Sequence, residues 1–326
     1  MLLEVRQLTK RYRDGRLVVH AVEQVDLQLD RGRVLGLVGE SGCGKTTLGR
    51  CVVRLVEPTS GQVVLDGTDL TRLSPRRLRR HRRQMQVVFQ DPFLSLDPRM
   101  TVRTIVEEPL RIHGMGSRAW RRQRVDHVLE QVGLDPAMAQ RFPHQLSGGQ
   151  RQRVGIARAL APEPRLIVAD EPVSALDVSI QAQILNLLLR VQQQGDLSLI
   201  FISHDLRVVR AISHEVAVMY LGRVVEQGPP AALTSAGLHP YTRALAAAAP
   251  VLEPDQAPRL VLEGEPPSPT RPPSGCPFHP RCLLYGERQN PDCLNLRPLL
   301  RPAGKAHQVA CHEVGQVRET VDSTDG

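Results

Sequence analysis

The sequence has no long apolar run among its 326 residues. A helix that crosses a bilayer needs about 20 consecutive, mainly apolar residues. The strongest apolar runs here are the short segments 34–38, 166–169 and 199–202, and runs of that length are typical of buried parallel strands. The first residues, Met1–Arg6, also lack the apolar core of a signal peptide. We therefore expect a cytoplasmic protein without a membrane span.

Lysine is scarce, because Lys10, Lys45 and Lys305 are the only three lysines and the net charge of +8 comes almost entirely from arginine. A basic chain can bind nucleic acid or face an acidic membrane leaflet. The arginines concentrate in residues 72–83 without interleaved aromatic residues, so we interpret them as a solvated surface and expect no nucleic-acid partner. Against this background Lys45, inside a glycine-rich loop, stands out as a phosphate ligand.

The order of patterns along the chain predicts an α/β fold. Residues 2–12 and 22–29 alternate apolar and polar positions, which is typical of antiparallel strands with one solvated face. Later, short apolar runs alternate with helical periodicity, which predicts a parallel sheet with helices packed on it. The predicted strands there are 34–38, 85–89, 166–169 and 199–202, and the predicted helices are 45–56, 180–194 and 206–212, with 100–145 mainly helical.

A domain boundary is predicted after Gly228. Eight prolines lie between Pro250 and Pro273, and such a stretch cannot hold regular structure. We expect a linker at about 250–274, followed by a compact tail that carries four of the six cysteines. The expected domains are therefore 1–228 and 229–326.

The segment 39–47 has the composition of a phosphate-binding loop, and it stands between a predicted strand and a predicted helix, as that motif requires. Its glycines let backbone N–H groups turn toward the phosphates, and the helix N-terminus adds positive potential. We expect Lys45 to reach the β- and γ-phosphates as a catalytic residue, and the Thr46 hydroxyl to bind Mg²⁺. The residues expected to contact the nucleotide are Gly39, Glu40, Ser41, Gly42, Cys43, Gly44, Lys45, Thr46 and Thr47.

Two carboxylates, Asp170 and Glu171, follow the apolar run 166–169. A carboxylate at the end of a buried strand can meet the hydration shell of Mg²⁺, which is the role expected of Asp170. Glu171 is then placed to polarise the attacking water, as a catalytic residue. Such a pair is often only a polar strand terminus, but the phosphate loop upstream favours the functional interpretation.

Residues Leu146–Gln150 read Leu-Ser-Gly-Gly-Gln and form a second anion cradle ahead of a predicted helix. The chain already has one cradle in its phosphate loop. A second one is explained if it serves the γ-phosphate held by another subunit. The expected nucleotide contacts of this segment are Ser147, Gly148, Gly149 and Gln150.

This order of motifs resembles the ATP-binding cassette (ABC) family over roughly residues 2–228. The resemblance implies a mixed-sheet core, an antiparallel β subdomain and an α-helical subdomain at about 91–160. It also implies that two cassettes sandwich two ATP molecules, each between one chain's phosphate loop and the other chain's Leu146–Gln150. The second cassette chain is either another copy or a sister subunit.

The same resemblance implies roles for four further residues. His204, after the run 199–202, matches the catalytic switch histidine that contacts the γ-phosphate. Gln90 matches the glutamine that senses Mg²⁺ and water, while the loop after it touches the membrane partner. Asp177 belongs to the matching D-loop 174–177, and Tyr12 is placed like the aromatic residue that stacks on adenine.

Two segments resemble one subfamily in particular, the peptide and nickel importers. These are the extended loop 90–102 and the C-terminal pattern of 239–245 followed by Gly275–Cys282. The resemblance implies an import ATPase bound at the cytoplasmic face of the membrane beneath two permease subunits, with an extracytoplasmic binding protein that supplies peptides. Nickel, glutathione or oligosaccharide cargo remain open. A soluble DNA-associated ABC ATPase is the weaker alternative, because the chain lacks the long coiled coils of chromosome-type members and the greater length and CxxC pairs of excision-repair members.

The tail cysteines, Cys276, Cys282, Cys293 and Cys311, are separated by gaps of five, ten and seventeen residues. A reducing cytoplasm disfavours disulfides, which leaves a metal site or free thiols. Four thiolates suit zinc or an iron–sulfur cluster, although the CxxC spacing common in zinc sites is absent. Some members of the resembling subfamily bind a [4Fe–4S] cluster through cysteines at matching positions, so the resemblance favours iron–sulfur, with zinc or unliganded thiols as alternatives.

Overall fold

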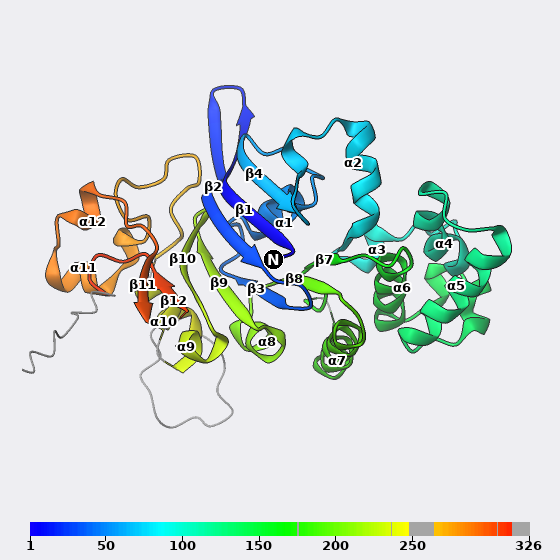
Figure 1. Ribbon diagram of the computed structural model, residues 1–326. Helices are drawn as coiled ribbons and strands as arrows, with labels where there is room; N and C mark the ends of the chain where they lie inside the picture. The colour runs from blue at the N-terminus through cyan, green and yellow to red at the C-terminus, as the bar shows by residue number, and fades with distance from the viewer. Residues whose placement is uncertain (175, 236, 248–263, 305, 315–326) are drawn as a thin grey trace, which may run out of the picture.

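The computed structural model describes residues 1–174, 176–235, 237–247, 264–304 and 306–314. Ala175 of the predicted D-loop and residues 250–263 of the predicted linker lie outside the described residues. The described chain forms a mixed sheet at the centre, an antiparallel sheet on one side of it, and helices around both (Figure 1). The strands are β1 (Leu3–Asp14), β2 (Leu17–Leu29), β3 (Val34–Val38), β4 (Ser60–Leu65), β5 (Thr68–Asp69), β6 (Met85–Val88), β7 (Leu166–Asp170), β8 (Ser198–Ser203), β9 (Glu215–Tyr220), β10 (Arg223–Gly228), β11 (Arg301–Gly304) and β12 (His307–Val309).

The helices connect and cover these strands. They are α1 (Lys45–Val52), α2 (Pro75–His81), α3 (Pro92–Ser95), α4 (Val102–Ile112), α5 (Arg118–Gln131), α6 (Gly148–Leu160), α7 (Val178–Gln194), α8 (Leu206–Ile212), α9 (Pro230–Ser235), α10 (Pro240–Ala247), α11 (Leu283–Arg288) and α12 (Asp292–Asn295). Among the residues that the structure describes, no helix is both long and apolar enough to cross a membrane.

The central sheet has the strand order β11-β12-β10-β9-β3-β8-β7-β6. The strands from β9 to β6 in this order run parallel, whereas β10, β12 and β11 pair antiparallel at the other edge. The antiparallel sheet has the order β2-β1-β4-β5. The α/β fold predicted from the alternating patterns is therefore the fold observed.

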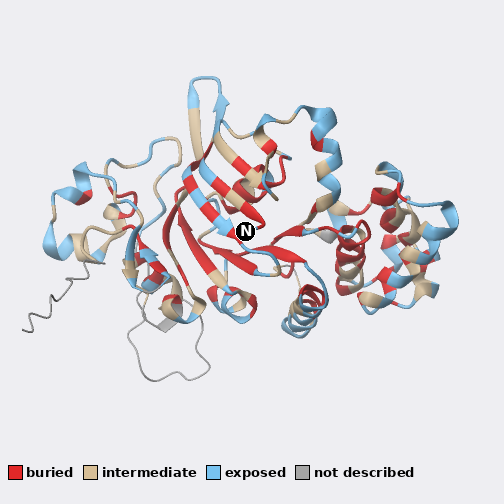
Figure 2. Cartoon of the chain, in the orientation of Figure 1, coloured by how far each residue is buried: buried red, intermediate tan, exposed pale blue. Residues whose placement is uncertain are grey.

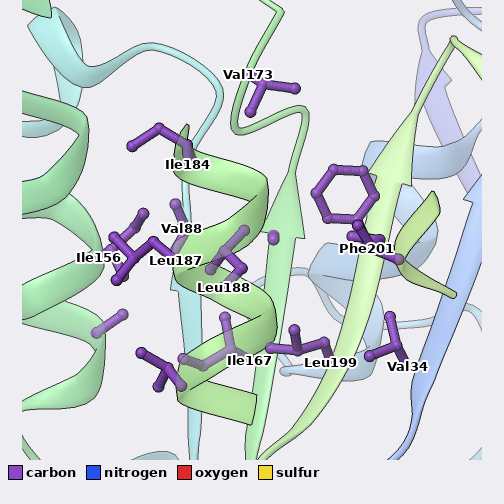
Figure 3. Packing of buried hydrophobic residues seen from close by; sticks show 14 of the residues in the cluster. Val34, Val88, Ile156, Ile167, Val173, Ile184, Leu187, Leu188, Leu199 and Phe201 are labelled. Atoms are coloured by element: carbon purple, nitrogen blue, oxygen red, sulfur yellow. The ribbon is translucent and has the colours of Figure 1, made fainter. Parts of the chain in front are cut away.

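Both faces of the central sheet are covered, which explains the short continuous apolar runs. Along β3, Val34 and Val38 pack on one side, whereas Leu35 and Leu37 pack on the other. Helices α6, α7 and α8 cover the first side, where Ile167 and Leu199 of the sheet belong to one hydrophobic cluster with Leu188 of α7 (Figure 3). Helix α1 and the antiparallel sheet cover the second side, so the central strands are buried along most of their length (Figure 2). A strand buried on both faces has no polar position to alternate with an apolar one.

Helices α3 to α6 form a lobe beside the sheet, at the right of Figure 1. The positions at amphipathic spacing in α5, Val125, Val128 and Leu129, are fully buried, as is Val132 just after the helix. Their burial against α4 and α6 holds the lobe together. The helices of this lobe lie within residues 92–160.

The C-terminal region 229–326, called the tail from here on, extends the central sheet. Strand β12 pairs antiparallel with β10, with Glu226 opposite Val309. The fully buried Glu226 carboxylate accepts the backbone N–H groups of Leu238 at 2.8 Å and His239 at 2.9 Å, and its Oε1 lies 2.8 Å from Nε2 of His307. One buried carboxylate therefore joins β10, the start of α10 and β12.

Replacing Glu226 by alanine leaves two buried N–H groups and the His307 ring without their acceptor. Breaking a buried charged network by removing one partner costs about 3 kcal/mol or more. We expect Glu226→Ala to lower the free energy of urea unfolding by about that amount. The exposed Glu130→Ala on α5 is the control and should change the unfolding free energy by less than about 0.5 kcal/mol. Equal effects of the two substitutions would contradict this role for Glu226.

His239 provides a pH-dependent contribution to stability. Its ring is 1% exposed, and Nδ1 accepts the backbone N–H of Tyr241 at 3.1 Å. Burial lowers the pKa of His239 from 6.5 to about 3. Between those two values the unfolded chain binds a proton that the folded chain excludes, so stability falls as the pH falls below 6.5.

His239→Asn keeps an acceptor for the Tyr241 N–H but removes the titrating group. We expect the loss of unfolding free energy between about pH 6.5 and about pH 5 to be about 2 kcal/mol smaller in the variant than in the parent protein. Urea unfolding across this pH range measures the difference. At about pH 8 the imidazole is neutral in both the folded and the unfolded state. Any difference in unfolding free energy between parent and variant at that pH therefore reflects packing alone. Parallel pH profiles would show that His239 does not exclude the proton.

Candidate functional site

The loop between β3 and α1 closes around the Lys45 ammonium group. Lys45 is 4% exposed and donates hydrogen bonds to the carbonyl oxygens of Gly39 at 2.8 Å and Glu40 at 2.9 Å. Gly44 has φ of 105°, and a Cβ atom there would lie 2.1 Å from the carbonyl oxygen of Ala21. Only glycine fits this close approach, so the sequence folds the loop directly ahead of the N-terminus of α1.

Thr46 and Asp170 meet where β3 and β7 end at the same edge of the sheet. The Thr46 hydroxyl donates a hydrogen bond of 2.8 Å to Oδ1 of Asp170, which is 4% exposed. Burial raises the pKa of Asp170, and the hydrogen bond from Thr46 partly offsets this. A hydroxyl and a carboxylate held side by side are oxygen ligands of the kind that Mg²⁺ prefers.

Glu171 lies between two side chains that come from other strands. Its Oε2 lies 3.2 Å from the amide Nε2 of Gln90, which follows β6, and 3.3 Å from Nδ1 of His204, which follows β8. Glu171 has φ of 45°, a left-handed conformation that is strained for a residue with a side chain. Its backbone N–H still donates to the carbonyl of Ile202 at 3.0 Å, so the sheet holds the strained residue in place.

These groups open into one pocket. Its lining residues include Lys45, Gln90, Glu171 and His204. The whole lining is Tyr12, Val19, Ala21, Ser41, Gly42, Gly44, Lys45, Thr46, Thr47, Gln90, Glu171, His204 and Pro269. Of the residues expected to contact nucleotide, Gly39, Glu40 and Cys43 do not line this pocket.

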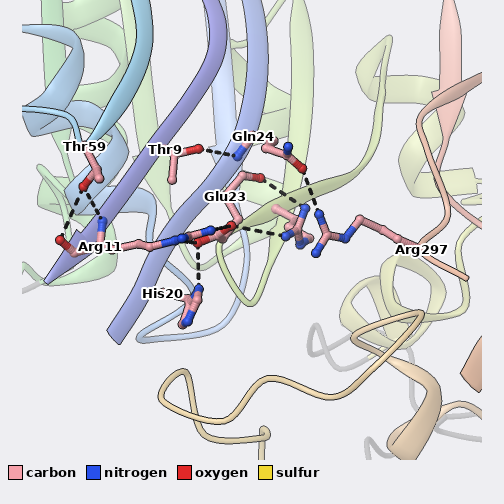
Figure 4. A network of polar contacts seen from close by, with 8 residues as sticks. Thr9, Arg11, His20, Glu23, Gln24, Thr59 and Arg297 are labelled. Carbon is pink, nitrogen blue, oxygen red and sulfur yellow. Dashed lines mark hydrogen bonds and ion pairs between the residues drawn. The ribbon is translucent and has the colours of Figure 1, made fainter. Parts of the chain in front are cut away.

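Tyr12 lies at the end of the pocket formed by the β1–β2 hairpin. It is 39% exposed, and the Lys10 ammonium lies 4.8 Å from the centre of its ring. The buried Glu23 braces this hairpin: Oε1 of Glu23 accepts from Nε of Arg11 at 2.6 Å and lies 2.7 Å from Nδ1 of His20 (Figure 4). Burial opposes ionisation of Glu23, but the bonds from Arg11 and His20 outweigh it and lower its pKa.

The back of the phosphate loop contacts the C-terminal tail, which sequence reasoning did not foresee. The Glu40 carboxylate points away from the pocket and pairs with Arg281 at 2.9 and 3.1 Å. The Glu40 backbone N–H donates to the Tyr241 hydroxyl at 2.7 Å. Arg281 and Tyr241 both lie in the C-terminal segments that carry the subfamily resemblance. This resemblance was the only signal in the sequence that pointed to them.

The Leu146–Gln150 segment begins α6. The Ser147 N–H donates to Oε1 of Gln150 at 3.0 Å and the Gln150 N–H donates to the Ser147 hydroxyl at 3.3 Å, a reciprocal pair that caps the helix. A Cβ atom on Gly149 would lie 2.8 Å from Cγ2 of Ile180, so glycine permits close packing against α7. Of the described residues that line the pocket, none comes from 146–150. Asp177, directly before α7, is exposed and also outside the pocket lining.

The four tail cysteines are free thiols in one lobe of the structure. Cys276 and Cys293 are buried, and the Cys276 N–H donates to the Cys293 carbonyl at 2.9 Å. Burial, reinforced by the neighbouring thiols, raises the pKa of Cys276 to about 12 and that of Cys293 to about 11. Within the described part of the chain, however, no three His, Cys, Asp or Glu side chains are arranged to hold a metal ion. The iron–sulfur site predicted at Cys276, Cys282, Cys293 and Cys311 is therefore not supported by this arrangement.

Two family models match the chain. The ABC transporter model matches residues 22–174, and the model of the oligopeptide/dipeptide transporter C-terminal region matches residues 225–288. The first match spans the phosphate loop and Asp170-Glu171, and the second spans the tail segments that contact Glu40.

Relatives of known description align over almost the whole chain. A probable peptide ABC transporter ATP-binding protein of Sinorhizobium fredii is 54% identical, with 95% of this chain and 89% of the relative covered. The oligopeptide transport ATP-binding protein AppF of Bacillus subtilis is 50% identical, with 90% of this chain and 89% of the relative covered.

A solved structure with the same fold is a dimeric, post-hydrolysis ATP-binding cassette bound to ADP and Pi. It is 32% identical, with a TM-score of 0.65, and the match covers 70% of this chain and 99% of that chain. The chain is therefore an ABC transporter ATP-binding protein of the oligopeptide/dipeptide importer family, with that family's C-terminal region.

Proposed function

We propose that this chain hydrolyses ATP to power the import of peptides through a membrane permease. The observation that carries the catalytic assignment is the convergence of Gln90 and His204 on the Glu171 carboxylate at the mouth of the phosphate loop. Three separate strands bring these residues together, and the strained backbone of Glu171 is maintained there by the sheet. Peptide cargo is supported by the descriptions of the aligned relatives, with nickel, glutathione and oligosaccharide as the alternatives.

The residues of the pocket divide the work of phosphoryl transfer. Lys45 and the loop N–H groups neutralise the β- and γ-phosphates, and the Tyr12 ring stacks on the adenine. Glu171 accepts a hydrogen bond from the attacking water and orients it in line with the γ-phosphate, while His204, whose Nδ1 lies 3.3 Å from Oε2 of Glu171, contacts that phosphate.

The site also suits Mg²⁺, because Thr46, Asp170 and Gln90 offer a hydroxyl, a carboxylate and an amide oxygen next to the phosphate loop. When bound, Mg²⁺ supplies charge neutralisation at the phosphates. The Thr46–Asp170 hydrogen bond prepares two of these oxygen ligands on one side of the pocket.

A single chain carries only part of the composite site. The capped N-terminus of α6 presents Ser147–Gln150 away from the chain's own pocket. In the proposed assembly this segment, with Asp177, reaches the γ-phosphate held by a second cassette chain. That chain is a second copy or a sister subunit, and the dimeric cassette structure supports the pairing.

The permease partners are proposed to dock on the loop after Gln90. Phe93 and Leu94 in this loop are 61% and 88% exposed, and adjacent exposed apolar side chains favour a protein contact. Because Gln90 contacts Glu171, a shift of the docked loop reaches the catalytic carboxylate directly. We therefore propose that the chain lies at the cytoplasmic face of the membrane, with an extracytoplasmic binding protein supplying the cargo.

Glu171→Gln tests the catalytic assignment. The amide keeps the shape of the side chain but is a poor acceptor for the proton of the attacking water. We expect ATP hydrolysis and peptide uptake to fall by about 10²-fold or more, with ATP binding and co-purification of the permease subunits retained. Glu130→Gln on the exposed face of α5 is the control and should leave both rates unchanged. Uptake that survives Glu171→Gln would contradict the assignment.

The [4Fe–4S] cluster stays a prediction from the subfamily resemblance, and no step of the proposed reaction passes through it. Its ligands would be Cys276, Cys282, Cys293 and Cys311, although no three of these side chains are arranged to hold a metal ion in the described part of the chain. Protein purified without oxygen is expected to contain about four iron atoms per chain and to absorb visible light if the prediction holds. Colourless protein that carries zinc, or no metal, would contradict it.

A further inference from the structure

Arg281 of the tail contacts the phosphate loop at Glu40, which does not line the pocket. Arg281 ends a short 3₁₀ turn, His279–Arg281, and its side chain is 5% exposed. Its Nη1 donates to Oε2 of Glu40 at 2.9 Å and its Nη2 donates to Oε1 at 3.1 Å. A partly buried, bidentate arginine–carboxylate pair fixes both distance and orientation, which a single surface ion pair does not.

A second tail residue holds the backbone at the same point. The Tyr241 hydroxyl accepts the Glu40 N–H at 2.7 Å. Tyr241 is fully buried, with its ring centre 4.7 Å from that of Tyr220 and 5.5 Å from that of Phe278. Because the ring is packed on two sides, the hydroxyl has little freedom to follow a displaced loop.

Glu40 connects these contacts to the phosphate ligand. Its carboxylate and N–H are held by the tail, while its carbonyl oxygen accepts a hydrogen bond of 2.9 Å from Lys45. A change in the position of Glu40 therefore changes the position of a hydrogen-bond partner of the Lys45 ammonium. Among the described residues 39–47, Glu40 alone forms hydrogen bonds both with the tail and with Lys45.

We propose that the C-terminal tail positions the phosphate loop, with Arg281 as a positioning residue that acts on Lys45 through Glu40. The tail is in this sense part of the nucleotide site and not an appendage to it. A further contact agrees with this: Pro269 lines the pocket, and its carbonyl accepts the His20 N–H at 3.0 Å. The inference rests on the proposed assignment of residues 39–47 as the phosphate-binding loop.

Arg281→Met tests the proposal in the full chain. Methionine fills much of the volume but cannot pair with Glu40, so the loop should lose its tether. We expect the Kd for a fluorescent ATP analogue with Mg²⁺ to rise roughly tenfold. In the permease complex, the KM for ATP should rise by a similar factor while kcat at saturating ATP stays near the parent value, because Arg281 touches neither nucleotide nor the reacting atoms.

Variants of Glu40 test whether Arg281 affects the Kd through its ion pair with Glu40. Glu40→Gln should raise the Kd to a similar degree, and the double variant should be no weaker than either single variant, because both remove the same interaction. Arg281→Lys should give an intermediate Kd, since lysine keeps the charge but loses the two-pronged geometry. Additive effects of Glu40→Gln and Arg281→Met on the Kd would overturn the proposal.

Cys43 reports on the loop without any nucleotide. Its side chain is buried in the loop and 6% exposed, and Cys51 in α1 is fully buried. If Arg281 restrains the loop, alkylation of Cys43 in Arg281→Met should be roughly tenfold faster than in the parent, while Cys51 remains unreacted. Peptide mass spectrometry separates the two sites. Unchanged alkylation of Cys43 together with an unchanged Kd would overturn the proposal.

Two controls separate the possible failures. Arg288→Met removes an ion pair between Arg288 and Glu313, 2.6 Å long, that lies within the tail and does not involve the phosphate loop, so it should leave the Kd unchanged. If Arg288→Met raised the Kd as much as Arg281→Met does, any damage to the tail would weaken nucleotide binding. That result would overturn a role specific to Arg281. Lys45→Met should abolish nucleotide binding. If it does not, the assignment of the phosphate loop itself is wrong, whatever Arg281→Met shows.

Discussion

Parallel pairing of β3 with β8 and of β8 with β7 is the constraint on which the site depends. Parallel strands end at the same edge of a sheet, so the residues that follow them are brought together although they are far apart in the sequence. Here that edge collects the phosphate loop after β3, Asp170 and Glu171 at β7, and His204 after β8. The register of a buried sheet is strongly specified by its apolar faces, and it holds Thr46 within 2.8 Å of Asp170.

The same sheet also carries the tail. Beyond β9 the strands turn antiparallel, and β12 adds to the edge formed by β10. Glu226 fastens α10 and β12 to this edge, and α10 places Tyr241 behind the phosphate loop. The hydrophobic core runs without a break from the cassette into the tail, since Phe278 and Cys276 pack with Tyr220. Tail and cassette therefore share one sheet and one core, although a proline-rich segment interrupts the tail.

In the proposed assembly, one chain supplies halves of two different nucleotide sites. Its pocket contains the side chains proposed to bind ATP and to orient the attacking water, whereas the capped N-terminus of α6 lies outside that pocket. The reason is geometric: α6 belongs to the helical lobe, and none of the described residues at its N-terminus, 146–150, lines the chain's own pocket. In the proposed assembly a second cassette chain completes both sites, and the exposed Phe93 and Leu94 are the proposed contact surface for the membrane partner.

The sequence by itself determined the local features. Glycines at 42 and 44 are needed for backbone that other residues cannot adopt, and apolar runs such as 34–38 predict strands buried on both faces. The roles expected of Lys45 and Glu171 followed from their positions after such strands, whereas the role expected of His204 came from the family resemblance. Only the tertiary structure decided that Glu40 faces the tail and that Arg281 and Tyr241 hold it. Glu40 and Arg281 are 241 residues apart in the sequence, and no local pattern encodes a contact that arises only when the sheet joins both ends of the chain.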